Sequence, residues 1–176
     1  FPRLQDGQLV FSGGCDNVVK MWSPAQNQSV VLGQHNAPVK EVFWADPIKL
    51  VVSGSWDKTL KYWDPRQVIA VLPPHCCVAD PSRCFYQPGK QPAGSVDVGE
   101  RVYAMDLKGQ LLVVGTADRK LHIYDVKNPQ RPYRVDESPL RFQTRVISCF
   151  PDCTGFAVGS IEGRCGIQYV NERDKA

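Results

Sequence analysis

One short pattern occurs four times along the 176-residue chain and restricts its fold more than any other feature. Each copy contains a glycine, an acidic residue three positions later and, in the first three copies, an aromatic residue six positions after the acid. The surrounding segments alternate between apolar and polar side chains, which is typical of half-buried β-strands. The copies are SGGCDNVVKMW (12–22), SGSWDKTLKYW (53–63), VGTADRKLHIY (114–124) and VGSIEGRCGIQ (158–168).

Each copy is predicted to be a β-hairpin, in which a turn with small residues and an acid joins two strands. A further strand is predicted before three of the hairpins, at 39–45, 101–107 and 145–151. Every unit therefore has at least three strands in about 40 residues, without a helix-length amphipathic segment between units. This pattern predicts an all-β fold, a β-propeller with blades of antiparallel strands of the WD40 type.

Four residues of the second unit stand where the buried polar tetrad of such blades stands, namely His35, Ser53, Asp57 and Trp63. Because a buried imidazole and a buried carboxylate must satisfy each other's hydrogen bonds, the pair would fix the turn. We therefore assign His35 a structural role rather than one in catalysis or metal binding. Trp56 differs from these residues, since it lies just before the turn acid, at the rim, where it need not belong to the core.

The repeat spacing changes once along the chain. The repeated glycines are 41, 61 and 44 residues apart, so the second interval is about 20 residues too long. The excess falls in 68–90, where four prolines disfavour a regular central strand. We interpret 68–90 as an irregular insertion within a partial propeller that spans 1–176; a surface loop and an artefact of the gene model are both open explanations.

The same insertion contains the residues that come nearest to a metal-binding set. Adjacent cysteines do not easily point at one ion, and no CxxC pair is present, so we expect no metal there. A metal-linked or redox role for the insertion is the alternative. The residues concerned are His75, Cys76, Cys77 and Cys84.

Composition and the missing motifs restrict the function. The net charge of +3 is compatible with an anionic partner but is far below that of a nucleic-acid-binding arm. No run of about 18 apolar residues is present, so membrane insertion is not expected. Seven irregularly spaced cysteines favour a reduced, intracellular compartment. Because no catalytic triad, phosphate-binding loop or metal-spaced cluster is visible, we expect a non-enzymatic binding platform without a cofactor.

Several longer stretches resemble the nuclear-pore-associated mRNA-export WD40 propeller proteins. The resemblance covers nearly the whole chain except 68–90, and includes SPLRFQTR (138–145) and GSIEGR (159–164). Spindle-checkpoint WD40 proteins share QTR and SIEGR, whereas GFAVGS and LLVVGTA favour the export family. The resemblance implies a seven-bladed propeller, of which about four blades are present. A partial ring leaves unpaired strand edges, so we expect the isolated chain to be marginally stable or prone to aggregate.

The resemblance also implies a function. In the export family the top face of the propeller binds a short, partly acidic nucleoporin peptide at the nuclear pore, in support of poly(A) RNA export from the nucleus. The alternative is a checkpoint protein that binds checkpoint kinases at kinetochores. Arg164 matches the family arginine that pairs with glutamates of the peptide, and its planar guanidinium can hold a carboxylate through two hydrogen bonds. The candidate peptide-binding residues are Arg164, Glu162, Trp56 and Arg145; Lys58 and Arg119 are a candidate basic patch for the peptide or for RNA phosphates.

Overall fold

The computed structural model describes residues 9–66 and 91–171. Within these ranges the regular structure consists of β-strands, which form four antiparallel sheets of three or four strands. Sheet 1 contains β1 (Val10–Gly13), β2 (Val18–Ser23) and β3 (Gln28–Gln34). Sheet 2 contains β4 (Val39–Ala45), β5 (Leu50–Ser55), β6 (Thr59–Trp63) and β7 (Gly94–Asp97). Sheet 3 contains β8 (Val102–Lys108), β9 (Leu111–Thr116), β10 (Lys120–Asp125) and β11 (Arg134–Glu137). Sheet 4 contains β12 (Thr144–Cys149), β13 (Gly155–Ser160) and β14 (Cys165–Tyr169).

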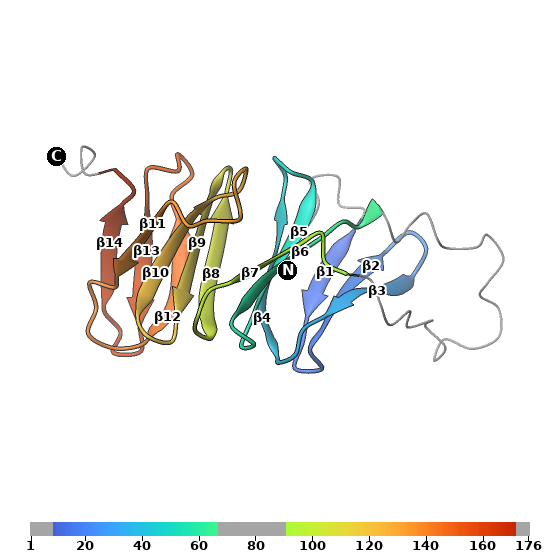
Figure 1. Cartoon of the computed structure of the whole chain (residues 1–176), viewed down its shortest axis with the longest axis horizontal. Coiled ribbons are helices and arrows are strands. Elements are labelled where there is room, and N and C mark those ends of the chain that lie inside the picture. Colours follow the sequence, from blue (N-terminus) through green and yellow to red (C-terminus); the bar gives the residue numbers. More distant parts are fainter. Residues whose placement is uncertain (1–8, 67–90, 172–176) are drawn as a thin grey trace.

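The four sheets follow one another in chain order, with sheets 1 and 4 at opposite ends of the row (Figure 1). Neighbouring sheets touch through β1 and β4, through β4 and β8, and through β8 and β12. This arrangement is that of consecutive propeller blades, and the ring does not close within the part of the chain that the structure describes. The predicted all-β, incomplete propeller is therefore confirmed.

All four predicted hairpins form, and they share one register. The repeated glycine pairs with the residue six positions later in every case. The residue four positions after the glycine has a positive φ in all four turns, which is the geometry of a type I turn followed by a left-handed residue. The four pairs are Gly13–Val19, Gly54–Leu60, Gly115–Leu121 and Gly159–Cys165.

Close packing between sheets explains why glycine recurs at this position of the repeat. A Cβ atom added at Gly13 or Gly115 would lie within 3.0 Å of a side chain on the inner strand of the following sheet, Val39 or Ile147 respectively. Contacts this short do not occur between real side chains, so a larger residue would push the two sheets apart. The glycine that defines the repeat is thus a site of close approach between blades.

The apolar core lies between neighbouring sheets. Trp63 of β6 is buried against sheet 1, where its ring fills the space that a side chain at Gly33 would need. Tyr124 of β10 is buried between sheets 3 and 2 in the same way. Trp22, at the equivalent place in β2, is 41% exposed, since the described residues leave that face of sheet 1 open.

Two further sequence predictions concern the insertion and membrane insertion. The insertion at 68–90, with its cysteines and His75, lies outside the described residues. Within the described ranges, no helix has the length and apolar character needed to cross a membrane.

Candidate functional site

The residues named for the tetrad are joined by hydrogen bonds in the structure. Nδ1 of His35 lies 2.8 Å from Oδ2 of Asp57, and Nε2 of the same ring lies 2.7 Å from Oγ of Ser53. The indole N–H of Trp63 donates to Oγ of Ser53 over 2.8 Å. Because His35 follows β3 of sheet 1 and the other three residues belong to the β5–β6 hairpin, the tetrad connects two sheets.

The electrostatics of the tetrad fix its protonation state. Burial lowers the pKa of His35, although Asp57 opposes this change, so the ring is neutral at pH 7. Burial alone would raise the pKa of Asp57, but hydrogen bonds from Thr59 and from the backbone N–H of Asn36 lower it to about 2. The neutral ring donates from Nδ1 to Asp57 and accepts the hydroxyl hydrogen of Ser53 at Nε2. Ser53 is fully buried, so this hydroxyl is not presented to a substrate.

Among the described residues, the turn acids of the other units have no imidazole partner. Asp16 pairs with Lys20 at 2.7 Å, and Asp118 accepts a hydrogen bond from the hydroxyl of Thr116. For Asp118 and Glu162 the reason lies in the residue at the position of His35, which is Val98 or Ser138 of the preceding unit. The backbone N–H groups of His35, Val98 and Ser138 all donate, over 2.8 Å, to the carbonyl of the left-handed turn residue of their unit. Only His35 among these three residues can reach a carboxylate with an imidazole.

The candidate peptide-binding residues lie at one end of the sheets. We call this end the turn face; it carries the hairpin turns at 14–17, 55–58, 116–119 and 160–163 and the connections at 35–38, 98–101 and 138–143. Arg164 is 78% exposed at its side chain and lies 3.7 Å from Glu162 in the same turn. Arg145 is exposed at the start of β12, whose first residue pairs with the end of β13.

The structure separates Trp56 from the other three candidates. Trp56 is 43% exposed in the turn of sheet 2, and its ring meets that of Tyr103 edge to face at 6.3 Å. Arg164, Glu162 and Arg145 all belong to sheet 4. A ligand that touches both groups must therefore cross the turn face of sheet 3.

The two residues of the candidate basic patch have acidic neighbours. Nζ of Lys58 lies 2.9 Å from Glu100, and a guanidinium nitrogen of Arg119 lies 2.8 Å from Glu137. Arg119 also donates to the carbonyl oxygen of Arg141 over 3.1 Å. These bonds tie hairpin turns to connecting segments, and they reduce the positive charge that the two residues offer to a phosphate.

Two exposed apolar residues of the turn face were not identified from sequence. Ile161 is 59% exposed and Phe142 is 48% exposed. The backbone N–H of Ile161 donates to the carbonyl of Gln143, so the two segments are neighbours. Ile161 stands two positions after its repeated glycine, as Trp56 does, and this equivalence is the signal that could have found it.

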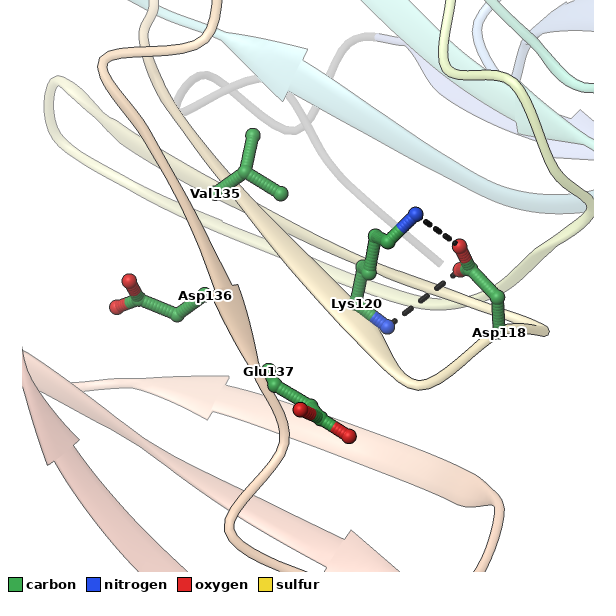
Figure 2. Close-up of a pocket in the computed structure, with 5 residues that line it drawn as sticks. All are labelled: Asp118, Lys120, Val135, Asp136 and Glu137. Carbon is green, nitrogen blue, oxygen red and sulfur yellow. Dashed lines mark hydrogen bonds and ion pairs between the residues drawn. The ribbon is translucent and has the colours of Figure 1, made fainter.

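A shallow pocket of about 280 Å³ lies on the outer part of sheet 3. Figure 2 shows Lys120 paired with Asp118 in this pocket. Because most of the lining side chains are acidic, the pocket is unsuited to an acidic peptide. Its lining residues are Asp118, Lys120, Val135, Asp136 and Glu137. In the described ranges, no three histidine, cysteine, aspartate or glutamate side chains converge on a common point that could hold a metal.

Comparison with known proteins agrees with this architecture. The family model described as "WD domain, G-beta repeat" matches residues 4–23 and 26–64. Together with the four blades, this match shows that the chain contains WD40 repeats arranged as propeller blades.

Within this class the chain is similar to mRNA export factors, as the sequence resemblance predicted. It is 43% identical over 175 residues to mRNA export factor GLE2 of Chaetomium thermophilum, an alignment that covers 98% of this chain and 43% of the relative. It is 37% identical to the mRNA export factor of Xenopus tropicalis and 38% identical to that of Pongo abelii, each over 180 residues, which cover 97% of this chain and 42% of the relative. The chain therefore spans less than half the length of these curated relatives.

Proposed function

We propose that the chain is part of a non-enzymatic WD40 scaffold that docks at the nuclear pore by binding an acidic nucleoporin peptide. In this role it supports the export of poly(A) RNA from the nucleus, and its place of action is the nucleus and the nuclear envelope. The names of the relatives support the export role. The peptide is the finer part of the proposal, and it depends on the turn face of sheet 4.

The observation that carries the proposal is the state of Arg164. Its side chain is 78% exposed, and among the described residues the carboxylate that pairs with it is that of Glu162, at 3.7 Å, which is longer than a direct hydrogen bond. Glu162 also accepts a hydrogen bond from the hydroxyl of Ser160. The guanidinium thus keeps most of its donors for a partner, and its planar shape suits a peptide carboxylate.

The rest of the turn face supports a peptide rather than a small molecule. The candidate residues lie on turns and loops around an exposed surface, and the tetrad that contains the histidine and serine is buried. Rigid blades that carry contact residues on connecting turns are suited to holding an extended or helical segment. Arg145 adds a second exposed cation in sheet 4.

The test compares two charge reversals in the full chain. An immobilised, glutamate-containing nucleoporin fragment is titrated with the wild-type chain, with Arg164→Glu and with Lys127→Glu, an exposed lysine in the connection at the other end of sheet 3. Arg164→Glu is expected to weaken binding about tenfold or more, since it replaces a paired charge by a like charge. Lys127→Glu is expected to leave binding unchanged. Equal affinities for wild type and Arg164→Glu would remove Arg164 from the site.

The checkpoint role is tested in the same assay. A fragment of a checkpoint kinase replaces the nucleoporin fragment on the support. The names of the relatives reported above favour export, and we therefore expect the nucleoporin fragment to bind more tightly. Preference for the kinase fragment would favour the checkpoint alternative.

A further inference from the structure

The turn that follows β2 has a serine where the second and third units have an aspartate. In the first three units, the aromatic residue of the repeat pairs with the residue three positions before the repeated glycine. The next residue along the chain is Ser23 in the first unit, Asp64 in the second and Asp125 in the third. These three residues therefore stand at one equivalent place in the fold, and only the first of them is not an acid.

The two aspartates close their turns through side-chain hydrogen bonds. Oδ1 of Asp64 accepts the backbone N–H of Arg66 over 3.0 Å, and Oδ1 of Asp125 accepts that of Lys127 over 2.9 Å. In both turns the donor lies two positions after the acid, which is the geometry of an Asx turn. An anionic acceptor at this place thus has a defined partner in the backbone.

The first unit does not have this closure. Among the described residues, the hydroxyl of Ser23 has no hydrogen-bond partner, and the backbone N–H of Ala25, two positions later, makes no hydrogen bond. A hydroxyl closes such a turn more weakly than a carboxylate does. The turn has the same residue type in its second position as the turn of the second unit, since Pro24 corresponds to Pro65. It is therefore a turn built like that of the second unit, without the anionic acceptor.

Ser23 is accessible to an enzyme that adds an anion. It is partly exposed, and 24–27 are exposed. The pair of Ser23 with Gln28 is the last pair between β2 and β3, so this end of the hairpin can open without disturbing the core. A serine followed directly by proline is the motif that proline-directed protein kinases recognise, and Ser23 is followed by Pro24.

The chain offers an internal comparison, because it contains a second Ser-Pro dipeptide, Ser138–Pro139. Ser138 is only 7% exposed. Its hydroxyl accepts the backbone N–H of Leu140 over 3.3 Å, and its own backbone N–H donates to the carbonyl of Arg119 over 2.8 Å. A kinase can reach this serine only after the connection between β11 and β12 has opened, so the folded chain presents one of its two Ser-Pro dipeptides.

We propose that Ser23 is a phosphorylation site of a proline-directed serine/threonine kinase, and that its phosphate takes the place of the aspartate in the equivalent turns. The kinase transfers the γ-phosphoryl group of ATP to Oγ of Ser23. The bond from the γ-phosphorus to the β–γ bridging oxygen breaks, the bond from Oγ to phosphorus forms, ADP leaves, and the hydroxyl proton passes to a base of the kinase.

The phosphate changes the charge and the hydrogen bonding of the turn. Residues 23–28 contain no charged side chain, and phosphoserine adds a charge of about −2 together with strong acceptor oxygens. One of these oxygens accepts the backbone N–H of Ala25, as the carboxylate oxygens do in the other turns. Phosphorylation thus converts a neutral turn into an anionic one and closes it.

The first test measures phosphorylation of the full chain by an active mitogen-activated protein kinase with magnesium and ATP. Mass spectrometry follows phosphate at Ser23 and at Ser138 over time. Each rate is divided by the rate for a synthetic peptide of the same sequence, 17–29 or 132–144, so that the ratio reports access in the folded chain rather than sequence preference. The ratio for Ser23 is expected to exceed that for Ser138 by about tenfold or more. No phosphate at Ser23, or equal ratios at the two serines, would overturn the site.

The second test asks whether the anion closes the turn. The wild-type chain is phosphorylated to completion, and its thermal unfolding is compared with that of the unmodified chain, of Ser23→Asp and of Ser23→Ala. The phosphorylated chain and Ser23→Asp are both expected to have a Tm about 2 °C above that of Ser23→Ala, since each gains the hydrogen bond to Ala25. A Tm of the phosphorylated chain at or below that of Ser23→Ala would show that the phosphate does not replace the aspartate.

This inference goes beyond the proposed function and can fail without it. Ser23 lies in sheet 1 and Arg164 in sheet 4, and these sheets are at opposite ends of the row (Figure 1). The turn after β2 is also at the end of the sheets away from the turn face. The phosphorylated chain is therefore expected to bind the nucleoporin fragment as the unmodified chain does.

Discussion

Nδ1 of His35 lies 2.8 Å from Oδ2 of Asp57, although the two residues are 22 positions apart and belong to different blades. The bond is part of a directed chain from the indole of Trp63 through Ser53 to the imidazole and the carboxylate. Within this chain each member is hydrogen-bonded to the next, and Asp57 also accepts hydrogen bonds from Thr59 and from the backbone N–H of Asn36. The tetrad therefore acts as a polar connection between sheets 1 and 2, inside an interface that is otherwise apolar.

The first prediction concerns removal of the tetrad acid. Asp57→Ala leaves the buried imidazole of His35 without its partner, and we expect a loss of about 3 kcal/mol in the free energy of unfolding. Asp16→Ala removes the equivalent acid of the first unit, which forms an exposed pair with Lys20. We expect that variant to lose no more than about 0.5 kcal/mol. Urea denaturation of both variants checks the contrast, and similar losses in the two would contradict it.

The second prediction concerns pH. The folded-state pKa of Asp57 is about 2, below its unfolded value of 3.8, so the stabilisation is complete above pH 4 and is lost as the pH falls towards 2. Burial also lowers the pKa of His35 below 6.5, so protonation favours the unfolded chain as the pH falls below this value. Stability is thus expected to decrease from pH 7 to pH 5 and again below pH 4. The midpoint of urea unfolding measured across this range checks both steps.

A variant separates the two steps. His35→Gln removes the titrating imidazole, so the decrease between pH 7 and pH 5 should become shallower while the step below pH 4 remains. If the midpoint of urea unfolding still decreased as steeply between pH 7 and pH 5 in this variant, that decrease would belong to another titrating group.

Much of the fold could be predicted from sequence because the repeated glycine has one physical cause. A glycine at the point of closest approach between blades, followed by a turn acid, recurs wherever a hairpin faces the next inner strand. The tetrad residues could be named for the same reason, since Ser53, Asp57 and Trp63 stand at fixed positions in that hairpin. The four residues are hydrogen-bonded in the structure.

The parts that the sequence did not reveal depend on tertiary contacts. Lys58 and Arg119 look like free cations in the sequence, but each meets a glutamate that is distant along the chain. Phe142 reads as one more apolar residue before a strand. In the structure its side chain is 48% exposed on the β11–β12 connection, and no periodicity in the sequence signals this exposure.

The third prediction concerns the left-handed turn residues. Lys58 has a φ of 70° at the position that Gly163 occupies in sheet 4. An L-residue is strained there and glycine is not, so Lys58→Gly relieves the strain. Lys58→Ala loses the same contact with Glu100 but keeps the strain. The glycine variant is expected to be more stable than the alanine variant by about 1 kcal/mol, as measured by urea denaturation. A less stable glycine variant would contradict the turn geometry.

The fourth prediction concerns two buried threonines. Among the described residues, the buried hydroxyl of Thr144 has no hydrogen-bond partner. Val39 of sheet 2 and Val102 of sheet 3 stand at the position that Thr144 occupies in sheet 4. Thr144→Val is therefore expected to stabilise the chain by about 1 kcal/mol, since it removes an unpaired buried polar group. Thr116 is the matched control, because its hydroxyl donates to Asp118. Thr116→Val should destabilise the chain by about 1 kcal/mol. Thermal unfolding of the two variants in parallel is expected to show a higher Tm for Thr144→Val and a lower Tm for Thr116→Val than for the wild type.

The central claim is that the turn face of sheet 4 is the surface that binds the peptide. Hydrogen–deuterium exchange of the full chain, with and without a saturating nucleoporin fragment, tests this claim most directly. We predict that bound peptide slows exchange in 138–145 and 160–164 and leaves 126–133, at the other end of the sheets, unchanged. Protection of 126–133 with no change in 138–145 and 160–164 would contradict the account.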